Sequence, residues 1–495
     1  MVRDEFDEFN TPKINIISRI FSSIFLVVSV YFVVKLGVMN ILPAKFFVPI
    51  AIGLGILNFV FGLVAFRSKT TKRTQIIYDI ITILLSIAII IAQSKLGEFE
   101  SFVKSNFVGT AKKYSVYEVI VSQRSTISTL KDLKGKEFFT YEEPVKEVSN
   151  EDLKEAIKNT IADSSLVFKE DLEPVMSRVL ALNDSASIVN NGTFESYLSI
   201  NEDYEEKIRV VGEIKIEIKD TVDNATDADK TTIADSPFIL YISGIDTRTG
   251  TMPSRSLSDV NIIAAVNPYT KKVLFVNIPR DSYVMIHGDT GLADKLTHAG
   301  SRGGVELSMA TIEDLLGVKP DRYIRVNFNF LEGFVNKIGG ISVQSSEDHT
   351  IVTLHNRCTI NPGENFVDGR CALGFVRERK SLKDGDIQRG KNQMHVLTRI
   401  IEKVSKDENL VNNLGDYLNS LNGSFDTNIS SDDITSLIRL QIDDMSGWSV
   451  EAYSIEGTGQ MGRTHSYPNQ DLYILVQDEN MVNTAKQKIN KTLGY

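Results

Sequence analysis

Three apolar runs in the first hundred residues constrain this chain more than any other feature of its sequence. Residues 20–34, 46–66 and 76–92 are almost free of charge, and a helix needs about 20 such residues to cross the hydrocarbon core of a bilayer. Arg19 and Lys35 flank the first run and can reach the interface from a slightly longer span. We therefore predict three transmembrane helices, at about 14–36, 45–66 and 76–93.

A cleaved signal peptide followed by a buried hairpin is the alternative for these runs. It is disfavoured because no small-residue cleavage site follows the first run and the second run has full spanning length. The loop Arg67–Arg73 is densely basic, which places it in the cytoplasm by the positive-inside rule. The chain after Gln93 is then outside, which predicts a multi-pass protein of the cell membrane with its bulk extracellular. Asp79 lies near the cytoplasmic end of its span and is interpreted as an interfacial acid.

The sequence divides into a membrane region, residues 1–97, and two α/β domains. Residues 98–225 mix helix-forming stretches with strand-like alternation, as in Lys207–Ile218, and predict a small extracellular accessory domain. Residues 226–236 are polar and predict a linker. Residues 237–495 alternate strands and helices, which predicts an α/β sandwich with a central sheet flanked by helices.

Charge and cysteine content exclude two common classes of function. The net charge of −10 leaves no basic excess to neutralise phosphates, so we expect no nucleic-acid partner. The only cysteines are Cys358 and Cys371, without a CxxC pair, which argues against a zinc cluster. None of the six histidines has HExxH-like spacing, and structural or surface roles are favoured for them.

Acidic and arginine side chains recur at the edges of apolar runs between Phe238 and Gln393. Carboxylates hold hard divalent cations through oxygen, and arginine forks bind phosphate oxygens in a bidentate way that lysine cannot match. Taken singly, Asp246 is also explained as a turn-forming acid, and Arg377 and Arg379 as part of a surface ion-pair run. Together the clusters predict a site for a metal–pyrophosphate group. Its candidate residues are Asp246, Arg255, Asp259, Arg280, Arg377, Arg379, Asp386, Arg389 and Gln393.

The order and spacing of these motifs resemble those of the LytR–CpsA–Psr family. The matching stretches are Gly244–Arg248, Ser258–Asn261, Ile278–Ser282, Lys295–Gly300, Gly339–Ile341 and Ala372–Arg379, followed by Asp386 and Arg389. The resemblance covers residues 237–404, roughly a third of the chain. The three spans and the outer domain are similar to those of the capsule-type, CpsA-like members.

The resemblance implies an extracellular, Mg²⁺-dependent phosphotransferase. Members of the family move a glycopolymer from a polyprenyl-pyrophosphate carrier to peptidoglycan, and the resemblance to capsule-type members implies a capsular polysaccharide here. The implied partners are the lipid-linked glycan, peptidoglycan, the membrane and capsule-assembly proteins. Two other classes of function stay open: a polyprenyl-pyrophosphate phosphatase, and a non-catalytic regulator or scaffold of capsule assembly.

The resemblance also implies roles for individual residues. Asp246 and Asp259 are the metal ligands, and with Arg280 and Arg377 they form the catalytic set. Substrate binding falls to Arg255, Arg280, Arg377, Arg379, Asp386, Arg389 and Gln393. Asp386 stands three residues before Arg389 and is expected to orient it, and Gln393, one turn later, is expected to face the same pocket.

One position departs from the family pattern. The family usually has an arginine two residues before the second aspartate, and Leu257 stands there. Arg255 serves instead only if the loop carries a local insertion. Either Asp259 or Asp281 is expected to take the proton of the incoming hydroxyl group. One set of apolar residues either lines a groove for the lipid carrier or packs in the core, and both alternatives stay open. The set is Val305, Leu307, Met309, Ile312, Leu315, Phe328, Phe330 and Phe334.

The two cysteines fall in the part of the chain expected outside the membrane, where a disulfide can form. The turn signal Asn361–Gly363 lies between them and could bring Cys358 back toward Cys371. Two free, buried thiols are the alternative.

Overall fold

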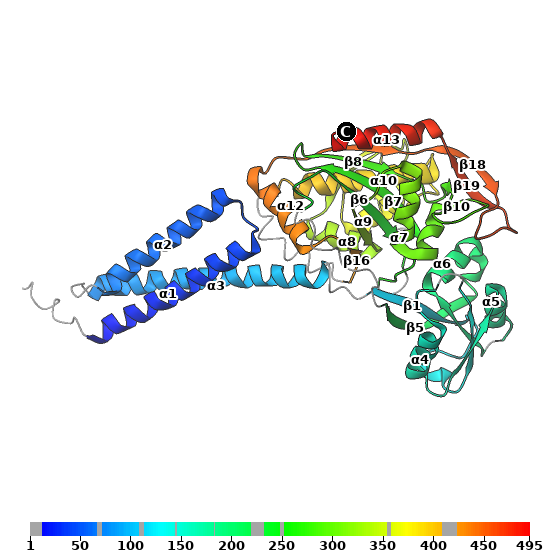
Figure 1. Cartoon of the computed structure of the whole chain (residues 1–495), viewed down its shortest axis with the longest axis horizontal. Helices are drawn as coiled ribbons and strands as arrows, with labels where there is room; N and C mark the ends of the chain where they lie inside the picture. The colour runs from blue at the N-terminus through cyan, green and yellow to red at the C-terminus, as the bar shows by residue number, and fades with distance from the viewer. Residues whose placement is uncertain are drawn as a thin grey trace, which may run out of the picture.

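A computed structural model describes residues 12–66, 72–107, 113–143, 146–182, 184–218, 232–247, 252–353, 358–407 and 423–495. Three long helices form an extended stem that projects from the rest of the chain (Figure 1). Residues 67–71, most of the basic loop, and residues 219–231, which include the first half of the expected linker, lie outside the described residues. The stem helices are α1 (Pro12–Met39), α2 (Ala44–Phe66) and α3 (Lys72–Asn106).

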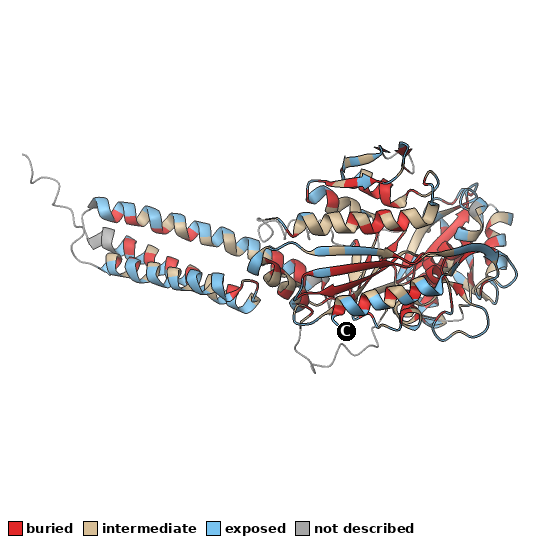
Figure 2. Cartoon of the chain, turned by 90° about the horizontal axis from the view of Figure 1, so that it is seen from above, coloured by how far each residue is buried: buried red, intermediate tan, exposed pale blue. Residues whose placement is uncertain are grey.

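Each stem helix is long and apolar enough to cross a membrane, over Ile16–Met39, Ala44–Phe66 and Arg73–Lys104. Large apolar side chains cover their outer surface, as the exposed positions along the stem indicate (Figure 2). An apolar surface of this extent is typical of a lipid-facing one. Residues 98–106, expected in the accessory domain, continue α3 instead.

Residues 113–218 fold into the accessory domain, a five-stranded sheet with helices on both faces. The strand order is β3-β2-β4-β1-β5, and β1 pairs antiparallel with both β4 and β5. Side chains alternate along β1, so Val119 packs on the α4 side while Ile120 packs against α5 and α6. The strands are β1 (Lys113–Ser122), β2 (Glu137–Tyr141), β3 (Ser165–Lys169), β4 (Ala186–Asn190) and β5 (Ile208–Ile218). The helices are η1 (Leu130–Leu133), α4 (Asn150–Thr160), α5 (Leu172–Ala181), α6 (Asn191–Ile200) and η2 (Glu202–Tyr204).

The C-terminal domain, residues 232–495, is built on a six-stranded mixed sheet of order β16-β11-β6-β7-β8-β17. Antiparallel β6, β7 and β8 form its centre, and β11 and β17 are added parallel to β6 and β8. This architecture confirms the predicted α/β sandwich. The strands are β6 (Phe238–Ile245), β7 (Ser258–Asn267), β8 (Lys272–Asn277), β11 (Arg322–Val326), β16 (Phe425–Thr427) and β17 (Ser449–Ser454).

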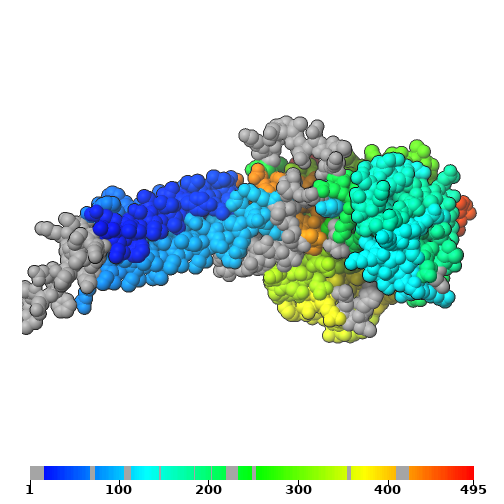
Figure 3. Space-filling model, turned by 90° about the horizontal axis from the view of Figure 1, so that it is seen from below, coloured from blue at the N-terminus to red at the C-terminus, as the bar shows by residue number. Residues whose placement is uncertain are grey.

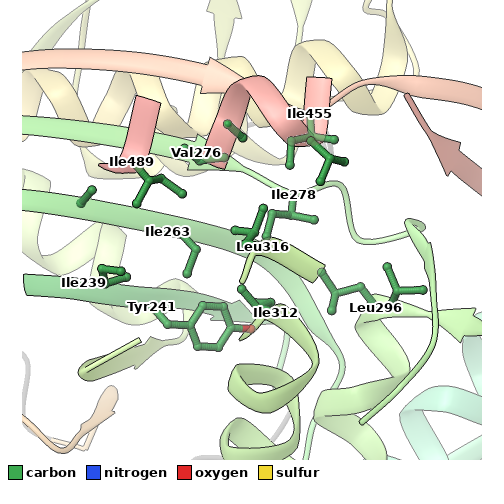
Figure 4. Packing of buried hydrophobic residues seen from close by; sticks show 14 of the residues in the cluster. Ile239, Tyr241, Ile263, Val276, Ile278, Leu296, Ile312, Leu316, Ile455 and Ile489 are labelled. Atoms are coloured by element: carbon green, nitrogen blue, oxygen red, sulfur yellow. The ribbon is translucent and has the colours of Figure 1, made fainter. Parts of the chain in front are cut away.

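Side-chain alternation gives the sheet two buried faces. Tyr241, Ile263 and Val276 point toward α7 (Leu296–Leu316) and α13 (Glu479–Leu493) (Figure 4). Ile262 and Phe275 point the other way, toward α10 (Gly385–Val404) and α12 (Ser431–Asp444). Each fully buried Ile or Phe side chain stabilises the fold by roughly 1.5–3 kcal/mol. The helices packed on both faces therefore fix the edge of the sheet from which the loops extend.

A smaller layer packs beside α10 and carries the disulfide. Cys358 is bonded to Cys371 in the first turn of α9, so the alternative of two free thiols is excluded. Phe328 and Phe334 pack into the same apolar cluster as the two cysteines. The elements here are α8 (Phe328–Lys337), β12 (Ile341–Ser345), β13 (Ile351–Val352), β14 (Thr359–Ile360), β15 (Gly363–Val367) and α9 (Gly369–Arg377). The remaining strands of the domain are β9 (Tyr283–Val284), β10 (Asp294–Lys295), β18 (Gly457–Gly462) and β19 (Leu472–Gln477).

The apolar residues considered for a lipid groove take part in core packing. Val305 and Ile312 are buried between α7 and the sheet, and Leu307, Met309 and Leu315 pack around them. Phe330 stacks on Phe334 at 6.0 Å between ring centroids. These contacts favour the core alternative.

The stem and the accessory domain contact the C-terminal domain at opposite ends (Figure 3). Phe102 of α3 belongs to the apolar cluster on the α10–α12 face of the sheet, and the ring of Phe107 lies 5.6 Å from that of Phe425. At the other end, α6 of the accessory domain packs against α7. Residues 252–257, just before β7, lie beside the accessory domain, and Tyr114 forms a bridge with Pro253 there.

Candidate functional site

A cavity of about 310 Å³ lies where α6 of the accessory domain meets the C-terminal ends of β6 and β8. Five of the nine predicted site residues line it: Asp246, Asp259, Arg280, Arg377 and Arg379. The other lining residues are Phe194, Glu195, Leu198, Ser199, Glu205, Leu257, Glu378 and Lys380.

Strand pairing explains why these residues meet. Asp246 follows the last residue of β6, and Asp259 is the second residue of β7. Because β6 and β7 are antiparallel, with Ile245 opposite Ser258, the end of one strand lies beside the start of the next. Antiparallel pairing of β8 with β7 brings Arg280, three residues past the end of β8, to the same edge. Arg377 is the last residue of α9, and Arg379 follows two residues later.

Two ion pairs join the clusters. Arg280 donates from Nη1 to Oδ1 of Asp259 at 2.8 Å, and Arg377 donates from Nη2 to Oδ2 of Asp246 at 3.0 Å. The guanidinium of Arg377 also lies over the ring of Phe328, 4.0 Å from its centroid. A cation over an aromatic face is attracted to it, so this contact holds the fork in one orientation.

The surroundings of the Arg280–Asp259 pair keep both side chains charged. Burial alone would raise the pKa of Asp259, but the positive charges of Arg280 and Arg389 outweigh it and hold that pKa below its usual value. The carboxylate of Asp259 in turn raises the pKa of Arg280 above its ordinary range. The cavity therefore presents fixed charges of both signs.

Asp386 and Arg389 are not among the residues that line the cavity. Arg389 is 7% exposed, and its Nη2 is 2.7 Å from Oδ1 of Asp386. This contact is the orienting one expected from their spacing. Burial lowers the pKa of Arg389, with Asp386 acting in the opposite direction. Helix α10 approaches β8 closely here because residue 390 is glycine: a Cβ atom on Gly390 would lie 2.3 Å from the side chain of Asn277.

Gln393 of α10 contacts the backbone that leads into Arg377. Its amide donates to the carbonyl oxygen of Val376 at 3.2 Å, the residue before Arg377. Neither Gln393 nor Arg389 is among the residues that line this cavity, and the expectation that both face the substrate stays a prediction. Gln393 holds the backbone before Arg377, and the charge of Arg389 acts on Asp259.

Residues 208–489 match the LytR_cpsA_psr family, which is more than half of the chain. The protein belongs to the LytR_cpsA_psr family. This confirms the resemblance inferred from the motifs between Gly244 and Arg389.

Named relatives show how far the likeness extends. The chain is 34% identical over 257 residues, 50% of its length, to 80% of the polyisoprenyl-teichoic acid–peptidoglycan teichoic acid transferase TagU of Enterococcus faecalis. It is 30% identical over 263 residues, 52% of its length, to 77% of the corresponding transferase TagT of Bacillus subtilis. Among solved structures, B. subtilis TagV is 26% identical with a TM-score of 0.45, and the match covers 52% of this chain and 98% of that one.

Leu257 stands where an arginine was expected, and Arg255, two residues earlier, lies at the interface between the domains. Arg255 is 3% exposed and forms ion pairs of 3.1 Å with Glu143 and 3.3 Å with Glu147, both in the accessory domain. It is absent from the residues that line the cavity. The local geometry places Arg255 at the interface between the domains, and its role in binding substrate stays a prediction.

The donor set at Asp246 and Asp259 fits a divalent cation. Both carboxylates line one cavity, and each directs one oxygen to a guanidinium in the ion pairs above. Among the described residues, three ligand-type side chains converge only at the largely exposed group of Glu347, Asp348 and His349. A cation held by Asp246 and Asp259 would therefore complete its shell with water or substrate oxygens, as Mg²⁺ commonly does with phosphates.

Sequence reasoning missed the contribution of α6. Phe194, Glu195, Leu198 and Ser199 stand at i, i+1, i+4 and i+5, so one helical face forms a wall of the cavity. Nothing in the local sequence distinguishes this face from a core-packing one. Only the docking of the accessory domain brings it to the site.

Proposed function

We propose that this protein is a membrane-anchored phosphotransferase that moves a glycopolymer, with a linking phosphate, from a polyprenyl-pyrophosphate carrier to peptidoglycan. One observation carries the proposal: Arg280, Arg377 and Arg379 converge with Asp246 and Asp259 in a single cavity. Three arginines supply bidentate donors for a pyrophosphate, and two carboxylates supply oxygen ligands for a divalent cation.

The chain's own residues stabilise the charge that develops as the pyrophosphate is cleaved. Arg280 is fixed by Asp259 and Arg377 by Asp246 and Phe328, so their donors are oriented before the substrate arrives. Asp246 and Asp259 would hold Mg²⁺, which, when bound, supplies further positive charge at the phosphate oxygens. Arg379 lies beside Arg377 in the same cavity and would bind the remaining oxygens.

The carried polymer belongs to this proposal as well. A capsular polysaccharide is the proposed cargo, from the likeness of the three spans and outer domain to capsule-type proteins. The relatives TagU and TagT are named for teichoic acid, so teichoic acid is the alternative cargo. The partners are a lipid-linked glycan, peptidoglycan and the membrane.

Incubation of the full-length protein in lipid nanodiscs with either lipid-linked polymer, Mg²⁺ and peptidoglycan oligomers tests the reaction. Polymer phosphate joined to the oligomer supports the proposal, and the polymer that reacts identifies the cargo. Free polymer ending in phosphate would instead indicate a pyrophosphatase. Carrier binding without turnover would indicate a regulator or scaffold.

The proposed membrane orientation places the N-terminus in the cytoplasm and the two α/β domains outside. The basic loop Arg67–Arg73 supports it through the positive-inside rule, and the disulfide Cys358–Cys371 is compatible with an oxidising outer face. A peptide tag inserted after Thr70 should resist external protease in intact cells, while the C-terminal domain is digested. Digestion of the tag would overturn this orientation.

A further inference from the structure

The cavity contains five carboxyl groups, which differ in their partners. Asp246 and Asp259 are held by Arg377 and Arg280. Glu378 accepts hydrogen bonds through Oε1 from the backbone N–H groups of residues 379 and 381, at 3.0 and 3.1 Å. Each of these three carboxylates is therefore engaged by a fixed donor.

The two remaining acids come from the accessory domain, and only one of them is buried. Glu205 is exposed on the turn after α6, whereas Glu195 of α6 is 8% exposed. Glu195 accepts through Oε2 a hydrogen bond of 2.6 Å from the hydroxyl of Ser256 and one of 3.1 Å from the backbone N–H of Leu257. Its Oε1 is buried and accepts no hydrogen bond of ordinary geometry among the described residues, although the side chain of Asn191 is close enough to lower the pKa of Glu195.

Glu195 also lacks a cationic partner. Within the described parts of the chain, no lysine, arginine or histidine lies within ion-pair distance of its carboxyl group. Burial raises the pKa of Glu195 to about 8, although the hydrogen bonds from Ser256 and Leu257 favour the ionised form. A carboxyl group in this environment is a much stronger base, once ionised, than an exposed one.

The two carboxylates first expected to take the proton are poorly suited to it. Asp259 has a lowered pKa and is bonded to Arg280. Asp281 accepts from Nζ of Lys295 at 3.0 Å and lies 3.7 Å from Nε of Arg280. Asp281 is also absent from the residues that line the cavity.

We infer that Glu195 of the accessory domain completes the site as the proton acceptor for the incoming hydroxyl group. The inference rests on the proposed transfer reaction. The hydroxyl oxygen forms a bond to the phosphorus that carries the glycopolymer, and the bridging P–O bond of the pyrophosphate breaks. The lipid phosphate leaves with the electron pair of that bond, and the hydroxyl proton passes to a carboxylate oxygen of Glu195. Water then removes the proton.

Contacts between the two domains hold Glu195 beside the cavity. The segment that joins the domains runs from Arg255, paired with Glu143 and Glu147, to Leu257, bonded to Glu195. Asp259 lies two residues further along. Glu195 is therefore connected through three residues of backbone to the acid that holds Arg280, and its position relative to the phosphate-binding arginines is fixed.

Several charged groups face Glu195 and set its titration. Glu118 of β1 acts on it from within the accessory domain and raises its pKa. Across the cavity stand the paired acids Asp246 and Asp259, with Arg280, Arg377, Glu378, Arg379 and Lys380, and Glu205 lies on its rim. The rate of transfer should accordingly rise with pH through about 8, as Glu195 loses its proton.

Glu195→Gln tests the role because it keeps the shape and removes the basic oxygen. In the full-length protein with lipid-linked glycan, Mg²⁺ and peptidoglycan oligomers, kcat should fall by roughly 10²–10⁴-fold and lose the rise near pH 8. Affinity for the carrier, measured separately by binding, should be unchanged because Arg280, Arg377 and Arg379 remain. Glu155→Gln on the exposed face of α4 is the matched control and should keep wild-type rates.

A second variant separates a proton acceptor from a structural anchor. Ser256→Ala removes a hydrogen bond that favours the ionised form, so it should move the pH midpoint of kcat upward while Glu195 still works. Wild-type kcat and pH profile in Glu195→Gln would overturn the inference. So would a loss of thermal stability and carrier affinity that matched the loss of rate. If the wild-type protein itself transfers no glycan, the proposed function fails, independently of Glu195.

Discussion

Arg377, the last residue of α9, donates to Asp246, the first residue after β6, at 3.0 Å. The pair joins two segments that are 131 residues apart and closes the cavity between the central sheet and the disulfide-bonded layer. Its geometry depends on supports that do not touch the cavity: Phe328 beneath the guanidinium, and Gln393 bonded to the carbonyl group of Val376.

Arg377→Ala should lower the rate of glycopolymer transfer by roughly 10²–10³-fold, because removing one preorganised donor commonly costs about 2–4 kcal/mol of transition-state stabilisation. Arg377→Lys should recover little, since an ammonium group cannot reproduce the planar fork. Arg370→Ala, exposed on the same helix, is the control. Full activity in the lysine variant would indicate diffuse charge instead of a shaped site.

Asp246→Asn and Asp259→Asn should each lower turnover and raise the Mg²⁺ concentration needed for half-maximal rate, because each removes a charged oxygen ligand. Asp348→Asn belongs to the exposed group of Glu347, Asp348 and His349 and should leave that concentration unchanged. The measurement is rate against Mg²⁺ concentration. Unchanged dependence in both cavity variants would mean that the two acids are structural.

Arg255→Ala should destabilise the interface between the domains by about 3–5 kcal/mol, since it leaves Glu143 buried without its positive partner. Arg463→Ala breaks an exposed pair with Asp471 and should cost about 0–1 kcal/mol. Hydrogen exchange of β1 and α6 would report the loosening. A tenfold loss of carrier affinity with unchanged exchange would support the substrate-binding role predicted for Arg255.

Cys358→Ser combined with Cys371→Ser should destabilise the outer region by about 3 kcal/mol, because the disulfide closes a short loop in the unfolded chain. The rate of transfer should also fall, because α9 carries both Cys371 and Arg377. Intact mass after alkylation under denaturing conditions without reduction should show no added alkyl group in the wild-type protein. Addition of two groups would contradict the disulfide.

Asp294 predicts an acid-sensitive contribution to stability. Burial would raise its pKa, but the hydrogen bond and charge of His298 outweigh that effect and lower it to about 2. A lowered pKa stabilises the fold above the unfolded value near 3.8, and this stability, roughly 2 kcal/mol, is lost as pH falls toward 2. Asp294→Asn should lower the thermal midpoint at pH 7 and flatten its dependence between pH 4 and 2. Asp203→Asn, at an exposed position, should change neither.

The family, the apolar spans and the α/β architecture were readable from the sequence because each depends on a local pattern. Spans are determined by the composition of about 20 adjacent residues, and strands such as β6 and β7 by alternation and nearby turns. Asp246, Asp259 and Arg280 were predictable as a group because each lies close to one end of a strand: Asp246 and Arg280 after β6 and β8, and Asp259 at the start of β7. Helical spacing predicts that Arg389 and Gln393 share a face of α10, but it does not place that face relative to the cavity.

The sequence by itself therefore determined which segments are long and apolar enough to cross a membrane, which runs form the sheet and which charged residues gather at its edge. Only the tertiary structure decided that Arg255 is used at the domain interface, that Cys358 meets Cys371, and that Glu195 reaches the site. These three depend on contacts between segments that are distant in the chain. Such contacts are selected by the packing of whole surfaces, and no local pattern around Glu195 or Arg255 records which surface it will meet.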